Sequence, residues 1–202
     1  MTKTCPQGAI TQAARILRQG GVVAFPTETY YGLGVDPFNT TALERLFAVK
    51  QRSSKKAILL LIEKKAQVDV FARHIPHDFI SLMARFWPGP LTLVFPALPR
   101  VSSLVTGGTG TVGIRQSPHF LVQQIVQMYG GPVTGTSANI SGHPPATTAD
   151  QVAEIFGSDV DYIVDGGITP GGNGSTVVGF RQTIFCIREG LIPFSHIKSC
   201  LN

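Results

Sequence analysis

The chain has 202 residues, of which 43% are apolar and 14% are charged. This composition excludes an intrinsically disordered chain, and the length suffices for one domain that buries roughly 70% of its unfolded surface. The net charge of +5 favours anionic partners such as nucleotides or RNA, although it says nothing about the fold. We therefore expect a single domain over residues 1–202 with an anionic ligand.

Cysteine content and hydropathy narrow the class of protein further. Cys5, Cys186 and Cys200 are odd in number and widely spaced, which argues against a disulfide framework and a zinc site. The first residues carry no apolar run of signal-peptide length, and the longest apolar run, at 57–62, is far too short to cross a bilayer. We expect a cytoplasmic protein with no membrane contact.

Helices and strands alternate in the first half of the sequence. Apolar residues at helical spacing predict a helix over 10–17, and a buried strand follows at 22–25. Thr41 and Glu44 have the spacing of a capping box at the start of the next helix. The run at 57–62 is wholly apolar, which predicts a strand covered on both faces.

The second half continues with more strands. A helix is predicted at 78–86, and another at 118–129 with Phe120 and Leu121 on its inner face. The remaining predicted strands cover residues 91–95, 111–115, 132–136, 162–164, 176–180 and 183–188, the last two as an antiparallel pair. The pattern predicts an α/β fold, a single-domain twisted sheet of mixed parallel and antiparallel strands flanked by helices.

Three polar clusters, at 26–34, 135–142 and 174–178, each follow an apolar strand-like run. Open α/β sheets bind ligands at strand ends, so hydroxyls and amides from these clusters are expected to share one pocket. The clusters lack the carboxylate and histidine partners of a hydrolytic triad or a metal cage. The predicted occupant is a polar, anionic small molecule.

Two glycine-rich segments resemble nucleotide-binding loops in their letters alone. Residues 108–113 match G-x-G-x-x-G, but a strand and not a helix is predicted to follow, which argues against a dinucleotide site. Residues 171–176 lack the lysine of a P-loop. Both segments are interpreted as loops that fold over a ligand, with an ordinary flexible loop at Gly107-Gly108 as the alternative.

Positive charge is concentrated at Lys50 and Arg52, with Lys55 and Lys56 close behind. One interpretation is that Lys50 and Arg52 only complement the dipole of the preceding helix. The other is that an anion bridges the cluster, since lysine and arginine together suit polyphosphate and carboxylate groups.

Ser137 lacks the G-x-S-x-G frame of a nucleophile, so Ser137 and Asn139 are interpreted as hydrogen-bonding groups around a phosphate or ribose. Glu28 either contributes to the pocket or ties down its turn through backbone N–H groups. Arg115 and Arg188 stand at strand ends, where a solvated arginine is ordinary. Their placement beside the other clusters favours contact with the ligand.

Seven motifs in this order resemble the YrdC domain family, the threonylcarbamoyl-AMP synthases of tRNA modification. The matching segments are P-T-E-T-x-Y-G-L-G at 26–34, K-x-R at 50–52, W-P-G-P-x-T at 87–92, R-x-x-P at 115–118, T-S-A-N-x-S-G at 136–142, S-T-V-V at 175–178 and I-R-x-G at 187–190. The resemblance covers nearly the whole chain.

The resemblance implies an enzyme, a nucleotidyltransferase that makes threonylcarbamoyl-adenylate and pyrophosphate from L-threonine, bicarbonate and ATP, with Mg²⁺ accompanying the ATP. Other proteins would then transfer the threonylcarbamoyl group to adenosine 37 of tRNAs that read codons beginning with A. Direct contact with tRNA, if any, is expected to be weak.

The resemblance also implies the site residues. Lys50, Arg52, Ser137 and Asn139 would form a polar tetrad around the nucleotide and its phosphates. Threonine would be held by Thr29, Arg115 and Ser175, and ATP would also be contacted by Lys56, Thr111 and Arg188. Three positions depart from the family pattern: Ser53 replaces a proline, Leu61 a histidine of longer members, and Pro145 a serine.

Two other functions remain open at this point. The basic charge is compatible with a non-catalytic RNA-binding module, although aromatic residues are only 8% of the chain and no stacking motif is present. Carbamoyl transfer in metalloenzyme maturation, where similar domains occur inside larger proteins, would need zinc-finger and acylphosphatase-like regions that this sequence lacks.

Overall fold

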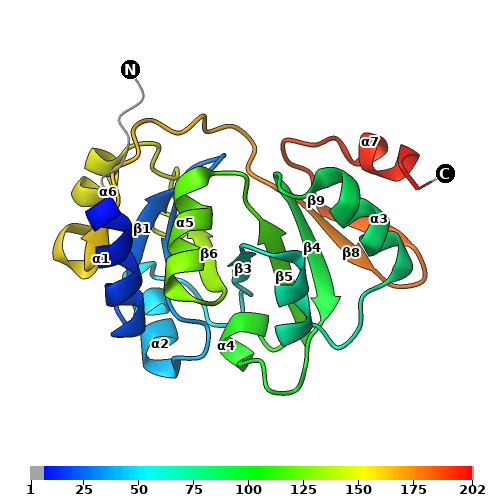
Figure 1. The fold of residues 1–202 in the computed structure, drawn as a ribbon, viewed down its shortest axis with the longest axis horizontal. Coiled ribbons are helices and arrows are strands. Elements are labelled where there is room, and N and C mark those ends of the chain that lie inside the picture. The colour runs from blue at the N-terminus through cyan, green and yellow to red at the C-terminus, as the bar shows by residue number, and fades with distance from the viewer. Residues whose placement is uncertain (1–6, 202) are drawn as a thin grey trace.

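A computed structural model describes residues 7–201, which form one nine-stranded sheet with helices packed on its faces (Figure 1). The strands are β1 (Val23–Pro26), β2 (Tyr31–Gly34), β3 (Leu59–Ile62), β4 (Leu91–Pro96), β5 (Thr111–Gln116), β6 (Val133–Ser137), β7 (Tyr162–Ile163), β8 (Thr176–Phe180) and β9 (Ile184–Arg188). The helices are α1 (Gln7–Arg18), α2 (Thr40–Val49), α3 (His77–Phe86), α4 (Ser103–Thr106), α5 (Phe120–Tyr129), α6 (Ala149–Phe156) and α7 (Phe194–Ser199).

The sheet order is β7-β1-β2-β6-β3-β5-β4-β8-β9. The pairs β1–β7, β3–β5 and β4–β8 are parallel and the other five are antiparallel. The segment between β7 and β8 runs along one edge of the sheet from one end toward the other (Figure 1). The predicted mixed sheet and the closing antiparallel pair are therefore confirmed.

Strand β3 explains why both faces of the sheet are covered. Leu60 and Ile62 belong to one buried cluster, while Leu61 between them belongs to the other, as the alternation of side chains along a strand requires. Helices α1 and α5 pack against each other over the Leu61 face (Figure 1). The two apolar layers bury the middle of the sheet and leave its strand ends to form the site.

Several sequence predictions need correction. The helix α2 is capped by Asn39, whose side chain accepts a hydrogen bond from the backbone N–H of Ala42 at 3.0 Å, so the predicted capping box is wrong. Phe120 is 64% exposed, because the buried stripe of α5 consists of other positions. That stripe contains Leu121, Val122, Ile125 and Val126.

Strand β2 and the short helices α4, α6 and α7 were not predicted. In β2 two glycines interrupt the apolar pattern, and glycine is depleted in strands. Gly34 is needed there because a Cβ would come within 2.7 Å of the Phe25 ring and 2.8 Å of the Thr134 carbonyl oxygen.

The part of the chain that the structure describes contains no helix long and apolar enough to span a membrane. Cys5, which belongs to the cysteine argument above, lies outside the described residues.

Candidate active site

A cavity of about 500 Å³ opens at the strand ends in the middle of the sheet. Its charged lining residues are Arg52, Arg115 and Arg188. Its hydroxyl and amide lining residues are Thr27, Thr29, Tyr30, Tyr31, Thr92, Thr109, Thr111, Thr136, Ser137, Asn173 and Ser175. Among residues 7–201, no Asp or Glu lines the cavity. A wall with three guanidinium groups and no carboxylate attracts an anion.

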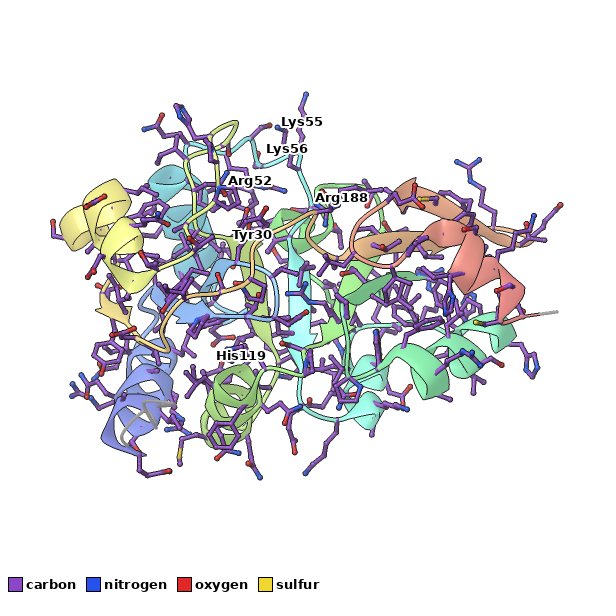
Figure 2. All side chains as sticks on the ribbon, turned by 90° about the horizontal axis from the view of Figure 1, so that it is seen from above. Tyr30, Arg52, Lys55, Lys56, His119 and Arg188 are labelled. Atoms are coloured by element: carbon purple, nitrogen blue, oxygen red, sulfur yellow. The ribbon has the colours of Figure 1, made fainter. Side chains whose placement is uncertain are left out.

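Arg52 reaches the cavity from the turn after α2. Its Nη2 donates to the Ala57 carbonyl at 2.9 Å, and burial lowers the pKa of the guanidinium from its usual value. Lys55 and Lys56 follow in the same turn with exposed side chains that extend outward near Arg52 (Figure 2). Lys56 thus lies near the rim of the cavity and does not line it.

Lys50, the C-terminal cap of α2, is buried with 1% exposure. Its Nζ donates to the carbonyl oxygen of Ser137, and to the carbonyl oxygen and Oδ1 of Asn139 at 2.8 and 3.3 Å. The three protons of the ammonium group therefore have three protein acceptors. Burial and the neighbouring charge of Arg52 lower the pKa of Lys50 to about 7. Lys50 does not line the cavity, and its hydrogen bonds instead anchor Ser137 and Asn139 at the end of β6.

Strand β6 presents Ser137, its last residue, to the cavity. The Ser137 hydroxyl donates to Asn139 Oδ1 at 2.6 Å, and Asn139 Nδ2 donates to the His143 carbonyl at 2.7 Å. Ser137 lines the cavity and is exposed, whereas Asn139 lies behind it. Hydrogen bonds therefore connect three members of the predicted tetrad, Lys50, Ser137 and Asn139. Arg52 is bonded to Ala57 instead and lines the cavity together with Ser137.

Buried hydroxyls line the opposite part of the cavity. Thr29 Oγ1 lies 3.0 Å from Thr27 Oγ1, and Ser175 Oγ lies 2.9 Å from Thr92 Oγ1. Arg188 Nη2 donates to the Ser175 carbonyl at 2.9 Å. The Thr29 and Ser175 hydroxyls are thus each fixed by the hydroxyl of a neighbouring threonine, and their positions are set before a ligand binds.

Arg115 enters the cavity from β5 with a side chain only 7% exposed. Its Nη1 lies 3.3 Å from Glu28 Oε1, and Glu28 Oε2 accepts a hydrogen bond from the Ser117 hydroxyl at 2.5 Å. Burial lowers the pKa of Arg115, Glu28 opposes that shift and Arg188 adds to it. The contacts found for Glu28 are thus with two side chains, and not with the backbone N–H groups of its turn.

The segment between β7 and β8 closes one side of the cavity, and we call residues 165–175 the strap. Tyr31 Oη donates to the Gly167 carbonyl at 2.9 Å, and the N–H of Gly171 donates to the Thr29 carbonyl at 2.6 Å. Tyr30 Oη donates to the carbonyl of Gly172, whose φ of +97° favours glycine. The strap is therefore tied directly to the turn that carries Thr29.

Most of the predicted site residues meet in this cavity. The cavity is lined by Thr29, Arg52, Thr111, Arg115, Ser137, Ser175 and Arg188, whereas Lys50, Lys56 and Asn139 lie outside the lining. Leu61 and Pro145, two of the positions that depart from the family pattern, also line it.

Sequence reasoning did not single out Thr92, Tyr30 or Asn173, which line the cavity too. The W-P-G-P-x-T segment contained a signal for Thr92. Tyr30 carried no signal because it occupies the variable position of its motif. The segment 108–113 leads into β5, which confirms the predicted strand, and its Thr109, Thr111 and Gly113 line the cavity.

Comparison with known proteins places this arrangement in a family. Residues 15–190 match the Sua5/YciO/YrdC family, whose description reads telomere recombination. The chain belongs to the Sua5/YciO/YrdC family. It is 38% identical over 191 residues to a threonylcarbamoyl-AMP synthase of Pyrococcus abyssi, and 43% identical over 166 residues to one of Vibrio vulnificus. These alignments cover 94% and 79% of this chain.

The chain spans 56% of the length of the Pyrococcus relative and 87% of the Vibrio relative. Among solved structures, Pyrococcus abyssi Sua5 complexed with L-threonine superimposes with a TM-score of 0.91 at 38% identity. That alignment covers 95% of this chain and 56% of the other. The family and the fold are therefore shared, and Sua5 is a relative that binds threonine.

Proposed function

We propose that this protein is a threonylcarbamoyl-AMP synthase. It would convert L-threonine, bicarbonate and ATP into threonylcarbamoyl-adenylate, pyrophosphate and water. The observation that carries the proposal is the cavity wall, which combines three guanidinium groups with ordered hydroxyls and has no carboxylate among residues 7–201. This wall suits an amino acid carboxylate together with a polyphosphate, and 38–43% identity to two synthases of this name supports it.

We assign the residues that line the cavity to two proposed regions, one for each substrate. Arg115, Thr29 and Ser175 would hold the carboxylate and hydroxyl of threonine, since they combine a cation with buried hydroxyls. On the other side, Arg52 and Ser137 face the region proposed for the nucleotide. Further ATP contacts are proposed for Lys56, Thr111 and Arg188.

The chemistry needs alignment more than acid–base catalysis. Bicarbonate would take up a proton and release water to give CO₂, and the threonine amine would add to this CO₂ and lose a proton to solvent. A carbamate oxygen would then attack the α-phosphorus as pyrophosphate leaves. The negative charge that develops on the phosphates would be met by Arg52. Lys50 and Asn139 would act from behind by fixing the position of Ser137.

The described residues contain no group of three or more His, Cys, Asp or Glu side chains that could hold a metal ion. The residues present therefore do not fit a resident metal, and we treat Mg²⁺ as part of the ATP substrate. The product adenylate would be consumed by proteins that transfer its threonylcarbamoyl group to tRNA. Use of ATP and supply of tRNA modification favour the cytoplasm as the location of the protein.

The test is an assay of pyrophosphate release by the purified protein with ATP and bicarbonate, in the presence and absence of L-threonine. The proposal expects release that depends on both threonine and bicarbonate, with threonylcarbamoyl-adenylate detected by mass spectrometry. Release of pyrophosphate that is independent of threonine, or none under any condition, would contradict it.

A further inference from the structure

We propose that Glu28 is a positioning residue of the amino acid subsite, which holds Arg115 so that its guanidinium group binds the substrate carboxylate. The inference rests on the proposed function and adds a residue that does not touch the substrate. Glu28 stands in the turn between β1 and β2, next to Thr29, and does not line the cavity. Any effect of Glu28 on the substrate must therefore act through a neighbour.

The contacts of Glu28 identify that neighbour. One carboxylate oxygen lies 3.3 Å from Arg115 Nη1, and the other accepts the Ser117 hydroxyl hydrogen bond at 2.5 Å. The Ser117 Oγ itself accepts from the backbone N–H of His119 at 3.2 Å. The Glu28 side chain is 13% exposed and that of Arg115 is 7% exposed. The carboxylate is thus anchored by Ser117, and its other oxygen forms an ion pair, without a hydrogen bond, with Nη1 of the guanidinium group.

The charges around Arg115 indicate what its other edge binds. Arg115 and Arg188 both line the cavity, and the charge of Arg188 disfavours the positive charge of Arg115. Glu28 supplies one negative charge for these two cations, so one positive charge remains without a partner. Arg115 Nε is buried and has no hydrogen-bond partner. An anionic group entering the cavity would provide the missing negative charge and a hydrogen-bond acceptor for Arg115 Nε. A carboxylate suits this role because its two oxygens match the planar guanidinium group.

A buried arginine without Glu28 would be free to turn away from this position, because burial already disfavours its charge. The effect should appear selectively in the binding of the substrate that carries the carboxylate. The nucleotide is proposed to contact Arg52 and Ser137 instead, so ATP should be bound as before.

The main test is Glu28→Gln, which keeps the size of the side chain and removes its charge. We expect kcat/KM for threonine to fall on the order of 10- to 100-fold, the scale associated with misplacement of a binding group, mainly through KM. The KM for ATP should stay unchanged. L-Threoninamide, which lacks the negative charge of the carboxylate, serves as a competitive probe. Its inhibition constant should be the same in Glu28→Gln and in the unmodified protein.

Two variants separate positioning from a general loss of stability. Asp161→Asn removes the carboxylate of another ion pair, with Arg45 at 2.7 Å, that does not line the cavity, and should leave the KM for threonine unchanged. Ser117→Ala keeps the charge of Glu28 and frees one of its oxygens. It should raise the KM for threonine by less than Glu28→Gln does, and it provides a second test if that variant does not fold.

A double-mutant cycle tests whether Glu28 acts through Arg115. In an Arg115→Ala background, Glu28→Gln should cause no further loss of threonine binding, whereas independent residues would give effects that multiply. A folded Glu28→Gln protein with an unchanged KM for threonine, or one equally impaired toward threonine and L-threoninamide, would overturn the inference. If the unmodified protein itself shows no threonine-dependent pyrophosphate release, the proposed function fails instead.

Discussion

Replacing Lys50 with methionine would distinguish three possible roles of this residue. Lys50 could complete helix α2, bind a phosphate, or anchor Ser137 and Asn139. Methionine keeps the length of the side chain in a site that is 1% exposed, and removes the ammonium group. The carbonyl oxygens of Ser137 and Asn139 and the Oδ1 of Asn139 then lose a charged donor. We expect both a less stable protein and a displaced loop after β6.

The size of the effect follows from two opposing terms. Only the Asn139 carbonyl is left without a donor among the described residues, at a cost of about 1–3 kcal/mol, because the Ser137 carbonyl keeps the Asn139 N–H and Asn139 Oδ1 keeps the Ser137 hydroxyl. Each of these other two acceptors loses one hydrogen bond to a charged group, about 1.5–3 kcal/mol, so the total loss is about 4–9 kcal/mol. Removing a buried ammonium group recovers several kcal/mol of desolvation. The net loss is about 2 kcal/mol, which lowers Tm by about 4–8 °C in a domain of this size. Misplacement of Ser137 by the loosened loop would lower kcat/KM on the order of 10²-fold.

The pH dependence of stability provides an internal check. The pKa of Lys50 is lowered to about 7 in the folded protein, against about 10.4 in the unfolded chain. The unfolded chain therefore binds more protons between these values, and the free energy of unfolding rises with pH by up to about 1.4 kcal/mol per unit. This contribution is fully present above about pH 10 and is lost as the pH falls to about 7. It should be absent from Lys50→Met.

Denaturant unfolding at pH 7 and pH 9, with threonine-dependent pyrophosphate release on the same preparations, measures all of these effects. A lysine that only completes the helix would cost at most about 1 kcal/mol and leave turnover intact. A lysine that only binds phosphate would leave Tm unchanged or raise it while turnover falls. Either result, or a stability difference between the two proteins that does not change with pH, would refute the proposed role of Lys50 in anchoring Ser137 and Asn139.

Three further predictions concern the substrates and the strap. Serine should have a lower kcat/KM than threonine, by the equivalent of about 1–3 kcal/mol. Valine should be rejected more strongly, because Thr29 and Ser175 would lose a polar partner. Equal pyrophosphate release with all three amino acids would contradict this prediction. Adenylate synthesis should not require tRNA, and any tRNA binding should weaken steeply with salt; a rate that depends on added tRNA would exclude this. Tyr30→Phe should speed hydrogen exchange at the Gly171 amide and raise KM for threonine, whereas unchanged exchange would show that Tyr30 does not secure the strap.

The sequence was sufficient for the parts of the fold that follow from regular patterns. The run at 57–62 is apolar at every position, which predicts a strand covered on both faces, and β3 lies in the middle of the sheet. Lengths of apolar runs and their turn residues also predicted the closing β8–β9 pair. Strand β2 was missed because Gly32 and Gly34 interrupt its apolar pattern, and the close approach of Gly34 to Phe25 is a tertiary requirement that no local pattern expresses.

The sequence predicted which residues belong to the candidate site, but not which of them line the cavity and which lie behind the lining. Motif order indicated that residues from distant segments belong together, and Arg115, Ser137 and Ser175 do line one cavity. The sequence could not indicate that Lys50 is buried against Ser137 and Asn139, because a run of basic residues does not show which lysine is buried and which is exposed. The same limit applies to Glu28, whose partners Arg115 and Ser117 lie 87 and 89 residues further along the chain.

Among residues 7–201 the cavity lining holds no Asp, Glu or His, and the proposed function therefore depends on how the cations of that lining are positioned. The cavity wall holds cations at Arg52, Arg115 and Arg188, whose mutual repulsion would favour their dispersal if each were free to move. Hydrogen bonds to the Ala57 and Ser175 carbonyls restrain Arg52 and Arg188, and Glu28 restrains Arg115. The electrostatic work of assembling these cations is therefore done as the protein folds. An anionic substrate then meets groups that need little reorganisation, which is the condition under which charge stabilisation contributes most to a reaction rate.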